Sequence, residues 1–511
     1  MNSKIDSGME SRLNSERRAL LLSILKSAFP IFITLESIAM IGVVDLEIAG
    51  RISSAAQAAV GLGDQLLYFT STAASGLSVA TCAIAARYFG AGNIKRMSST
   101  IKSSIAIATI CGIAAIIIGW VAADDFVRLL SSDAAVIQHG AKYIQLCSLG
   151  SLPYVLSIVI ASIFRSIERT AESLYSSLTT MVIAIGLSYL LFEVGPWKGS
   201  LDALCVAWIS AAYIGLGVSL VVLAKPAKQF AKSIVETEKR DCTVPTSIQI
   251  GNSRGQSISS IKPRRLTNAI NSSRADYRNA VRLIKLLFWI GAAVVLAESS
   301  TLATDFLVYK LLSMLDGATN LQAAWTIFLK IEETFAIMPI SALSLAFAAT
   351  VAQMIGQGKE KQARDCLKYL VVATSIASSV LGIVLVTAPH LMATFTHADR
   401  QVLNNAKQML FLLPVFLPLL AVRFLTFSFM EGAGQTSVPM RLALIGNVLK
   451  LVVAGLLMNA LSIGSIGLVF AILLSRTIMA IGAVRAAITT GKPATTSEVK
   501  FKPVTKALVA I

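Results

Sequence analysis

The chain has 511 residues, of which 55% are hydrophobic and only 14% are charged, and its mean hydropathy is +0.71. Soluble domains carry roughly 25% charged residues, so this composition excludes a soluble globular fold. The net charge of +17 fits Lys and Arg in cytoplasmic loops better than nucleic-acid binding, and the six cysteines form no CxxC pair that would indicate a zinc site.

The apolar residues gather in blocks whose length suits a membrane span. The hydrocarbon core of a bilayer is about 30 Å thick, which a helix of about 20 residues crosses. Blocks of this kind lie near 20–46, 57–86, 99–122, 136–164, 172–193, 201–224, 284–309, 321–352, 366–389, 403–429, 438–459 and 464–486. We therefore predict an all-α protein of twelve transmembrane helices embedded in the lipid bilayer.

The charges between the blocks alternate from one connection to the next. Segments 1–18, 87–102, 165–169 and 359–368 are rich in Lys and Arg, whereas the connections between them hold few basic residues. Since Lys and Arg collect in cytoplasmic loops, we predict that both termini lie in the cytoplasm. A plasma membrane or a bacterial inner membrane is the expected location.

The longest connection covers 225–282 and is both basic and Ser-rich. It carries twelve basic and four acidic residues. Such a composition buries too little apolar surface to fold alone, so we interpret the segment as a largely disordered cytoplasmic linker. A second interpretation, in which it binds anionic lipid, stays open.

The two sides of this linker resemble each other. An alignment pairs residues 75–92, SGLSVATCAIAARYFGAG, with 341–358, SALSLAFAATVAQMIGQG, at an offset of 266 positions, and eight of the 18 pairs are identical. Six helices in each half return the chain to the same face of the membrane, so a pseudo-twofold axis along the membrane normal would relate two six-helix lobes. The expected order is tail, lobe, linker, lobe and tail, at 1–18, 19–224, 225–282, 283–488 and 489–511.

Several motifs carry a resemblance to a known family. The first helix reads FPIFITLESIAMIGVVDLEIAGR and is followed by AQAAVGLGDQ, the second helix ends in AARYFGAGN, and the second half holds AQMIGQGK and FMEGAGQT. These motifs resemble those of the multidrug and toxin extrusion (MATE) family, although FRSIERT, the first-half counterpart of FMEGAGQT, lacks its glycines. The resemblance implies a two-lobed secondary transporter in which Asp45, within VVD, binds the coupling proton or sodium ion.

Ionisable residues inside the predicted helices are the candidate functional residues. Each costs about 2.5–3.5 kcal/mol at the centre of a membrane helix on insertion scales, so a chain retains it where it faces a partner or a cavity. The first half holds Glu36, Asp45 and Asp64. Glu36 is a second candidate for ion coupling, but it is half a turn out of phase with Asp45, so the two share a cavity only if the helix bends. Asp64 is a candidate for the substrate cavity or a charge network.

The second half is more heavily charged. Glu298 and Asp305 are seven residues apart on one helix face, which makes them further candidates for ion coupling. Lys330 is placed to pair with Glu333 three residues later. The candidates for the cavity or the charge network are Glu332, Glu333, Arg423, Lys450 and Arg476. These charges either lock the lobe together as buried ion pairs or form a gated coupling network, and both interpretations stay open.

The sequence holds no phosphate-binding loop and no catalytic constellation, so we predict a transporter and not an enzyme. The predicted activity is MATE-like antiport by alternating access, in which H⁺ or Na⁺ enters as a small cationic or amphipathic organic molecule leaves. We expect no cofactor besides the coupling ion, no metal besides Na⁺ at Asp45, no nucleic-acid partner, and a monomer.

Two alternatives stay open, namely an exporter of organic anions and a lipid-linked glycan flippase of the same superfamily. Acidic walls of the central cavity would favour cation efflux. Basic walls, with Arg423, Lys450 and Arg476 lining the cavity, would favour anions.

Overall fold

The structure is a computed structural model, and it describes residues 2–130, 134–194, 196–242, 264–315, 318–387, 400–460 and 465–489. These residues form helices joined by short connections. The helices of the first half are α1 (Asn2–Ile52), α2 (Ser54–Gly90), α3 (Ile94–Val121), α4 (Ala123–Leu130), α5 (Ala134–Ser148), α6 (Ser151–Ser166), α7 (Thr170–Glu193) and α8 (Asp202–Cys242). Those of the second half are α9 (Arg264–Leu312), α10 (Ala318–Glu332), α11 (Met338–Gly356), α12 (Glu360–Thr387), α14 (Arg400–Leu410), α15 (Leu413–Gly432), α16 (Ser437–Gly455) and α17 (Ser465–Thr489).

Among the described residues, ten helices are long and apolar enough to cross a membrane by themselves. The pair α5 and α6, bent by 51°, makes an eleventh span if it counts as one, and the remaining predicted block, 284–309, lies within α9. The bend follows from the sequence, because Pro153 sits in the first turn of α6, where its missing N–H needs no partner. Pro414 starts α15 in the same way, after α14 has ended at Leu410.

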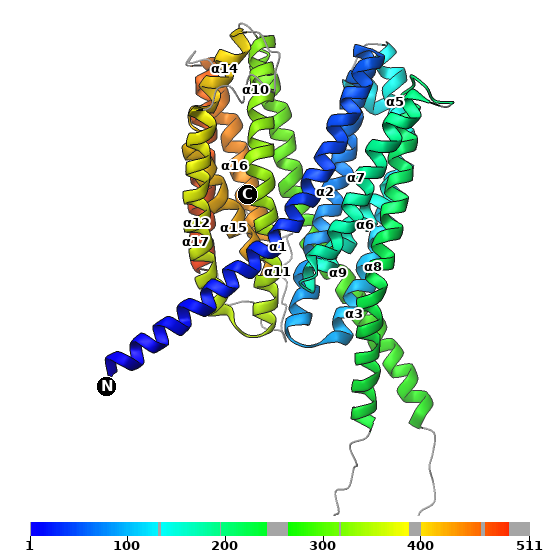
Figure 1. Cartoon of the computed structure of the whole chain (residues 1–511), viewed down its shortest axis with the longest axis vertical. Coiled ribbons are helices and arrows are strands. Elements are labelled where there is room, and N and C mark those ends of the chain that lie inside the picture. Colours follow the sequence, from blue (N-terminus) through cyan, green and yellow to red (C-terminus); the bar gives the residue numbers. More distant parts are fainter. Residues whose placement is uncertain are drawn as a thin grey trace, which may run out of the picture.

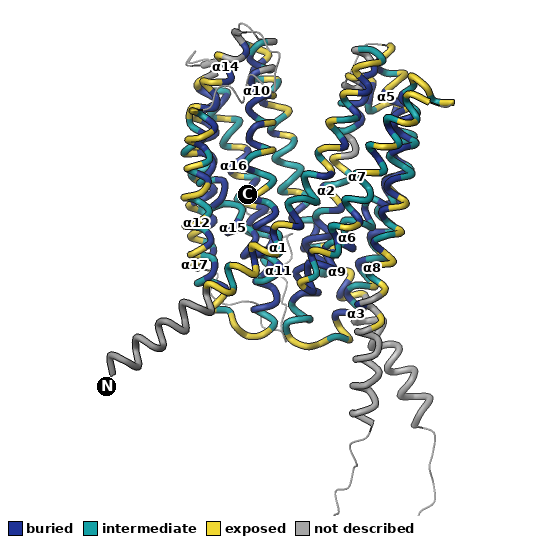
Figure 2. The backbone as a smooth tube through the Cα atoms, viewed as in Figure 1, coloured by how far each residue is buried: buried dark blue, intermediate teal, exposed yellow. Residues whose placement is uncertain are grey.

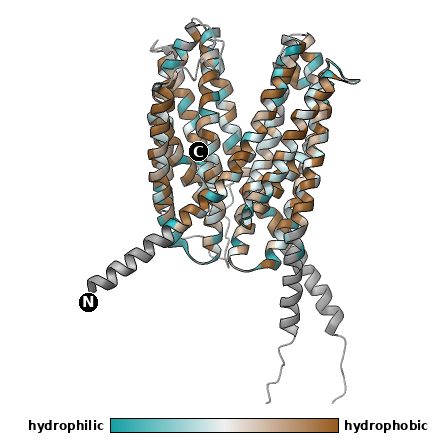
Figure 3. Cartoon of the chain, viewed as in Figure 1, coloured by the Kyte–Doolittle hydropathy of each residue, from teal (hydrophilic) through white to brown (hydrophobic). Residues whose placement is uncertain are grey.

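The helices form two lobes that stand side by side (Figure 1), with the first half in one lobe and the second half in the other. Buried residues concentrate inside each lobe and where the lobes meet (Figure 2). Hydrophobic residues cover the helices along their length, while hydrophilic ones gather at the connecting loops (Figure 3). Apolar side chains such as Ile110, 68% exposed, and Val372, 59% exposed, point outward, as expected for surfaces that meet lipid.

Two helices, α1 and α9, pack against both lobes. The first part of α1 packs into the second lobe, where Ile24 and Ile31 join the core built by α11, α12, α15 and α17, whereas Ile48 is buried among α2, α5 and α8. The first part of α9 does the reverse, because Leu287 lies in the core of α2, α3 and α6 and Val308 in the core of the second lobe. The same exchange in both halves is what a pseudo-twofold repeat predicts.

The backbones of the two lobes approach each other closely where α2 and α11 end. A Cβ atom on Gly90 would overlap the carbonyl oxygen of Gln353, and one on Gly356 would overlap the carbonyl oxygen of Arg87. Gly90 and Gly356 are the paired glycines of the aligned repeat, so each copy of the repeat provides the same close contact to the other. Only glycine allows this approach.

Reciprocal hydrogen bonds surround these glycines. The Arg87 guanidinium donates to the carbonyl oxygen of Ala433 over 2.7 Å, and the Gln353 amide donates to the carbonyl oxygen of Ser166 over 3.0 Å. Arg87 and Gln353 are equivalent positions of the repeat, 266 residues apart. We call the set Arg87, Gly90, Ser166, Gln353, Gly356 and Ala433 the interlobe seam.

The seam lies at the end of the bundle from which α8 leaves and to which α9 returns (Figure 1); we call this the linker end. Helix α8 continues to Cys242 and α9 begins at Arg264, so helix extends into both sides of the segment 225–282 that the sequence presented as a linker. Residues 243–263 lie outside the described residues. At the amino end, helix α1 begins at Asn2 and thus includes the segment predicted to be a tail.

Candidate functional site

In the first lobe the structure brings two candidate carboxylates together. Asp45 on α1 is only 7% exposed, and its charge and that of Asp64 on α2 are close enough to repel each other. The Asp64 carboxylate reaches α1 because Gly42 leaves room for it, with Oδ2 4.0 Å from where a Cβ would lie. Two adjacent carboxylates in a buried position form a site that gains from binding one positive charge.

The other groups around this carboxylate pair supply oxygen atoms. The Ser188 hydroxyl lies near the Asp45 carboxylate, and the Tyr143 hydroxyl donates a long hydrogen bond of 3.5 Å to Asp64. Ser188 and Tyr143 are 2% and 3% exposed. Two carboxylates and two hydroxyls suit a proton, which can bridge oxygens, and also suit Na⁺, since hard cations take oxygen ligands.

Glu36 lies on the same helix as Asp45 but belongs to a different environment. Its Oε1 atom is buried without a hydrogen-bond partner, and the charge that it meets is that of Glu333 in the second lobe. Asp45 instead meets Asp64 in the first lobe. Helix α1 therefore presents one carboxylate to each lobe, in keeping with the half-turn phase difference that the sequence indicates.

Glu298 lies at the boundary between the lobes. Although it belongs to α9, its carboxylate accepts a hydrogen bond of 3.1 Å from Ser75 on α2. Asp305, seven residues later on the same helix, contacts α16 of the second lobe instead. The two residues share a helix face in the sequence pattern, yet they meet different lobes because α9 passes from one lobe to the other between them.

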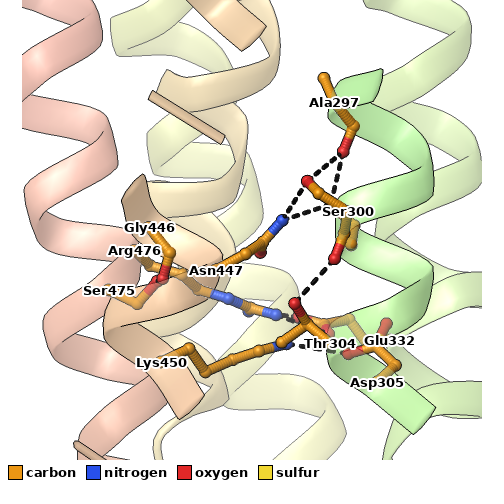
Figure 4. Close-up of polar contacts among 11 residues, drawn as sticks. Ala297, Ser300, Thr304, Asp305, Glu332, Gly446, Asn447, Lys450, Ser475 and Arg476 are labelled. Atoms are coloured by element: carbon orange, nitrogen blue, oxygen red, sulfur yellow. Dashed lines mark hydrogen bonds and ion pairs between the residues drawn. The ribbon is translucent and has the colours of Figure 1, made fainter. Parts of the chain in front are cut away.

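Asp305 is part of a polar network inside the second lobe (Figure 4). The Lys450 ammonium lies 2.8 Å from Asp305 Oδ1, and the Lys450 side chain is 12% exposed. One turn away, the Asn447 amide donates to the hydroxyls of Ser300 over 2.8 Å and Thr301 over 3.1 Å. The network ties α9 to α16.

A second ion pair in the same network joins Arg476 on α17 to Glu332 on α10. The pair is bidentate, with Nη2 2.8 Å from Oε2, and the Glu332 side chain is only 2% exposed. Arg476 also stacks over Phe416, its guanidinium carbon 5.3 Å from the ring centre. Glu332 and Arg476 are thus held as one buried unit, and the exposed pair Lys330–Glu333, 2.9 Å apart, confirms the predicted i,i+3 contact.

Arg423 differs from the other basic residues of this lobe. Its guanidinium lies over the rings of Phe424 and Phe427, at 4.9 and 6.0 Å, and its Nε has no hydrogen-bond partner. No salt bridge joins it to a carboxylate within the part of the chain that the structure describes. Arg423 is therefore a partly buried cation held by aromatic rings.

Two further charged residues were not among the sequence-based candidates. Arg165 ends α6 and Glu431 ends α15, and both line one small cavity between the lobes. Their positions differ by 266, the offset of the internal repeat, so extending the alignment to FRSIERT and FMEGAGQT would have paired them. Across the described ranges, no cluster of three or more His, Cys, Asp or Glu side chains is placed to bind a metal ion.

The fold, with its long apolar helices, defines a polytopic membrane protein. A model of the MatE family matches residues 30–190 and 293–456, one segment in each half. Because these segments cover more than half of the chain, the protein belongs to the MatE family, that of multidrug and toxin extrusion transporters. Membership makes it an integral, multi-pass membrane protein of a transporter family.

Curated relatives match part of the chain. The probable multidrug resistance protein NorM of Bacillus subtilis is 27% identical over 172 residues, 34% of this chain and 38% of that protein. The protein of the same name in Streptococcus pneumoniae is 26% identical over 220 residues, 41% of this chain and 47% of that protein. The chain thus spans less than half the length of the relatives that it matches.

Solved structures match nearly the whole chain. The Vibrio cholerae MATE transporter VcmN in its bent form superposes with a TM-score of 0.75 over 93% of this chain and 98% of that one, at 16% identity. A MOP superfamily transporter from Pyrococcus furiosus gives a TM-score of 0.73 at 17% identity, over 92% of this chain and 96% of that one. These likenesses confirm the predicted fold of two six-helix lobes.

Proposed function

We propose that the protein is a secondary antiporter that exports small organic cations or amphipathic molecules in exchange for inward-moving H⁺ or Na⁺. One observation carries the proposal, namely the unequal pairing of the buried charges. Lys450 and Arg476 are neutralised by Asp305 and Glu332. By contrast, no ion pair joins Glu36, Asp45, Asp64 or Glu298 to a cation among the described residues, and the one cation whose charge acts on this group is Lys330, near Asp64. The charge left unbalanced is therefore mainly negative, and it suits cations.

The arrangement of the lobes supports alternating access. The seam holds the lobes together at the linker end, and the ribbons diverge toward the opposite end, where α5 and α14 lie (Figure 1). Rocking the lobes about their contact would separate the seam and bring the opposite ends together. Such a motion alternately connects one central site with each side of the membrane.

The orientation follows from the basic loops. Segments 87–102 and 359–368, both rich in Lys and Arg, lie at the linker end of the bundle, where α8 leaves and α9 returns. The tendency of Lys and Arg to remain in the cytoplasm supports a cytoplasmic linker end and cytoplasmic termini. In this orientation, the conformation described here has its seam closed on the cytoplasmic side.

The Asp45–Asp64 pair is the proposed coupling site. When a proton or Na⁺ binds from outside, it removes the repulsion between the two carboxylates and the cost of burying a charge. The loaded site is then able to pass through an occluded state. Exchange follows if the organic cation and the coupling ion compete for these two carboxylates and for Glu298 at the lobe boundary. Binding of one then releases the other.

Transport by proteoliposomes tests the proposal. The purified protein is reconstituted, a pH gradient or a Na⁺ gradient is imposed separately, and movement of a fluorescent organic cation is followed. Uphill cation movement driven by one gradient is the expected result. Absence of cation movement under both gradients, in vesicles that contain folded protein, would refute the proposal.

A second candidate function, export of an organic anion or flipping of a lipid-linked glycan, has one observation in its favour. Arg423 is a partly buried cation without a salt bridge to a carboxylate among the described residues, and it would attract an anionic group. Replacing the organic cation by an organic anion in the same vesicles separates the two candidates. Arg423→Gln would abolish anion transport but leave cation transport in place.

A further inference from the structure

Two thiols that the proposed transport cycle does not use touch each other inside the first lobe. Cys147 lies in the last turn of α5 and Cys205 in the first turn of α8, and their sulfur atoms are 3.4 Å apart. The Cys147 thiol donates to Cys205 Sγ, and the Cys205 thiol donates to the carbonyl oxygen of Tyr143 over 3.9 Å. The two side chains therefore point at each other from neighbouring helices.

The thiol pair lies toward the end of the bundle opposite the linker end, where α5 is found (Figure 1). Asp202, three residues before Cys205, forms a salt bridge of 2.7 Å with Lys142, five residues before Cys147. The Lys142 side chain is 62% exposed, whereas Cys147 and Cys205 are 1% and 0% exposed. At a rise of about 1.5 Å per residue, the thiols lie about 5–8 Å inside the salt bridge along their helices. Local opening of the first turn of α8 thus exposes them to solution.

Oxidation is the chemistry that suits this pair. A disulfide needs two sulfur atoms about 2.0 Å apart on side chains that face each other, and Cys147 and Cys205 already face each other. A structural zinc ion needs four ligands, but within the described ranges no group of three or more His, Cys, Asp or Glu side chains is placed to bind a metal ion. The pair is therefore a site for a covalent bond between α5 and α8.

We propose that Cys147 and Cys205 form a reversible disulfide with hydrogen peroxide as the oxidant, and that this bond disturbs the neighbouring ion-coupling site. One thiol attacks a peroxide oxygen, so that an S–O bond forms, the O–O bond breaks and the thiol proton leaves with the second oxygen as water. The other thiol then attacks the sulfur of the sulfenic acid, the S–S bond forms, and the hydroxyl leaves with the second proton as water. Two thiols thereby give two electrons to one peroxide.

The burial of the pair selects the oxidant and makes the reaction reversible. Hydrogen peroxide is uncharged and nearly as small as water, so it reaches thiols that a charged or bulky oxidant does not. A lone sulfenic acid is open to further oxidation to the irreversible sulfinic acid. Here the second thiol, 3.4 Å away, intercepts the sulfenic acid first. The product is a disulfide, which a reducing thiol converts back to the pair.

The thiol pair shares a core with the proposed coupling site. Tyr143, one turn before Cys147 on α5, donates the long hydrogen bond of 3.5 Å to Asp64. Ile48, three residues after Asp45 on α1, packs in the same core as Tyr143 and both cysteines. Bond formation brings sulfur atoms that are 3.4 Å apart together by about 1.4 Å, and in a close-packed core the helices share in this movement. The shift reaches Tyr143, whose bond to Asp64 is already near its length limit.

Mass measurement on the purified full-length protein tests the disulfide and needs no transport. The parent variant keeps Cys147 and Cys205 and has the other four cysteines replaced by serine, namely Cys82, Cys111, Cys242 and Cys366. The protein is treated with hydrogen peroxide, unfolded in SDS and exposed to a maleimide. The treated parent should bind no maleimide and should have lost the mass of two hydrogen atoms, and dithiothreitol should restore both thiols. Cys147→Ser in the parent should gain oxygen or stay unchanged, because Cys205 then lacks its partner.

A second variant provides the matched control by keeping Cys82 and Cys366 in place of the pair. Both are 5% exposed, but they lie on α2 and α12 in different lobes. This control should not lose two hydrogen atoms. If the parent does not fold, wild-type protein digested after peroxide treatment should contain a peptide pair linked through Cys147 and Cys205 that dithiothreitol separates. Two free thiols in the treated parent, no linked peptides in the wild type, or the same mass loss in the control would overturn the disulfide.

Transport in proteoliposomes tests the effect on the coupling site, and this part of the inference rests on the proposed antiport function. Peroxide should remove most of the gradient-driven cation flux of the parent, and dithiothreitol should restore it. A variant of the parent that also carries Cys147→Ser and Cys205→Ser should respond to neither reagent. Equal flux through the oxidised and reduced parent would overturn the effect on the coupling site. A parent that forms the disulfide but moves no cation even when reduced would refute the antiport function and leave the disulfide in place.

Discussion

Loss of the Glu332 charge provides a quantitative test of the buried network. Glu332→Gln keeps the size of the side chain but leaves the Arg476 guanidinium, 15% exposed, without its counter-ion. Removing one partner of a buried ion pair costs about 3–5 kcal/mol. Because Arg476 retains its contact with Phe416 and some access to solvent, we expect a loss near the lower end, about 3 kcal/mol.

The neighbouring residue supplies the matched control. Glu333 forms its ion pair with Lys330, but the two side chains are 38% and 72% exposed, and an exposed pair contributes about 0–1 kcal/mol. Glu333→Gln should therefore change stability by less than about 1 kcal/mol. The double variant Glu332→Leu with Arg476→Met removes both buried charges and should recover most of the loss.

Unfolding in mixed micelles with increasing amounts of SDS, followed by tryptophan fluorescence, gives the free energies of these variants. The expected order of stability is wild type and Glu333→Gln together, the double variant near them, and Glu332→Gln well below. Equal losses for Glu332→Gln and Glu333→Gln would show that burial does not distinguish the two pairs, and it would refute the reasoning.

Three other outcomes can be tested with the same preparations. Asp45→Asn mimics the ion-loaded site, so it should fold normally yet fail to drive cation efflux in proteoliposomes; wild-type efflux would reject the site. Gly90→Ala and Gly356→Ala should each force the lobes apart at the seam and accelerate labelling by a water-soluble maleimide of Cys82, which lines the small cavity between the lobes. Gly186→Ala, whose Cβ would meet nothing within 4 Å, should leave this labelling rate unchanged. Equal labelling rates in all three variants would contradict the close contact. Replacing the central part of 225–282 by a Gly/Ser linker of similar length should leave stable expression intact, and loss of the folded protein on size-exclusion chromatography would show otherwise.

The sequence predicts the architecture of this protein well because membrane spans are governed by local rules. Length and hydropathy locate each helix, and the offset between 75–92 and 341–358 predicts two equivalent lobes. The local pair Lys330–Glu333 could also be predicted, since helix geometry alone brings i and i+3 together.

The partners of the other charges could not be predicted because they are set by tertiary packing. Asp305 pairs with a lysine that lies 145 residues further along the chain, and no periodicity specifies which helices become neighbours. Glu298 and Asp305 looked equivalent by spacing, but α9 passes between the lobes and separates their environments. The correspondence of Arg165 with Glu431 in the internal repeat, by contrast, could be found in the sequence once the alignment was extended beyond the matching residues.

The exchange of α1 and α9 between the lobes has a consequence for how the chain is made. The residues of α1 that pack into the second lobe, including Ile24 and Ile31, meet partners as late as Ala483 and Ala487. A ribosome has therefore synthesised nearly the whole protein before the first membrane helix can complete its packing. Until then one face of that helix lacks its packing partners. The first lobe likewise lacks α9, which completes the core around Leu287. Neither half is a self-sufficient folding unit, so the two halves of this duplicated protein mature together at the end of synthesis.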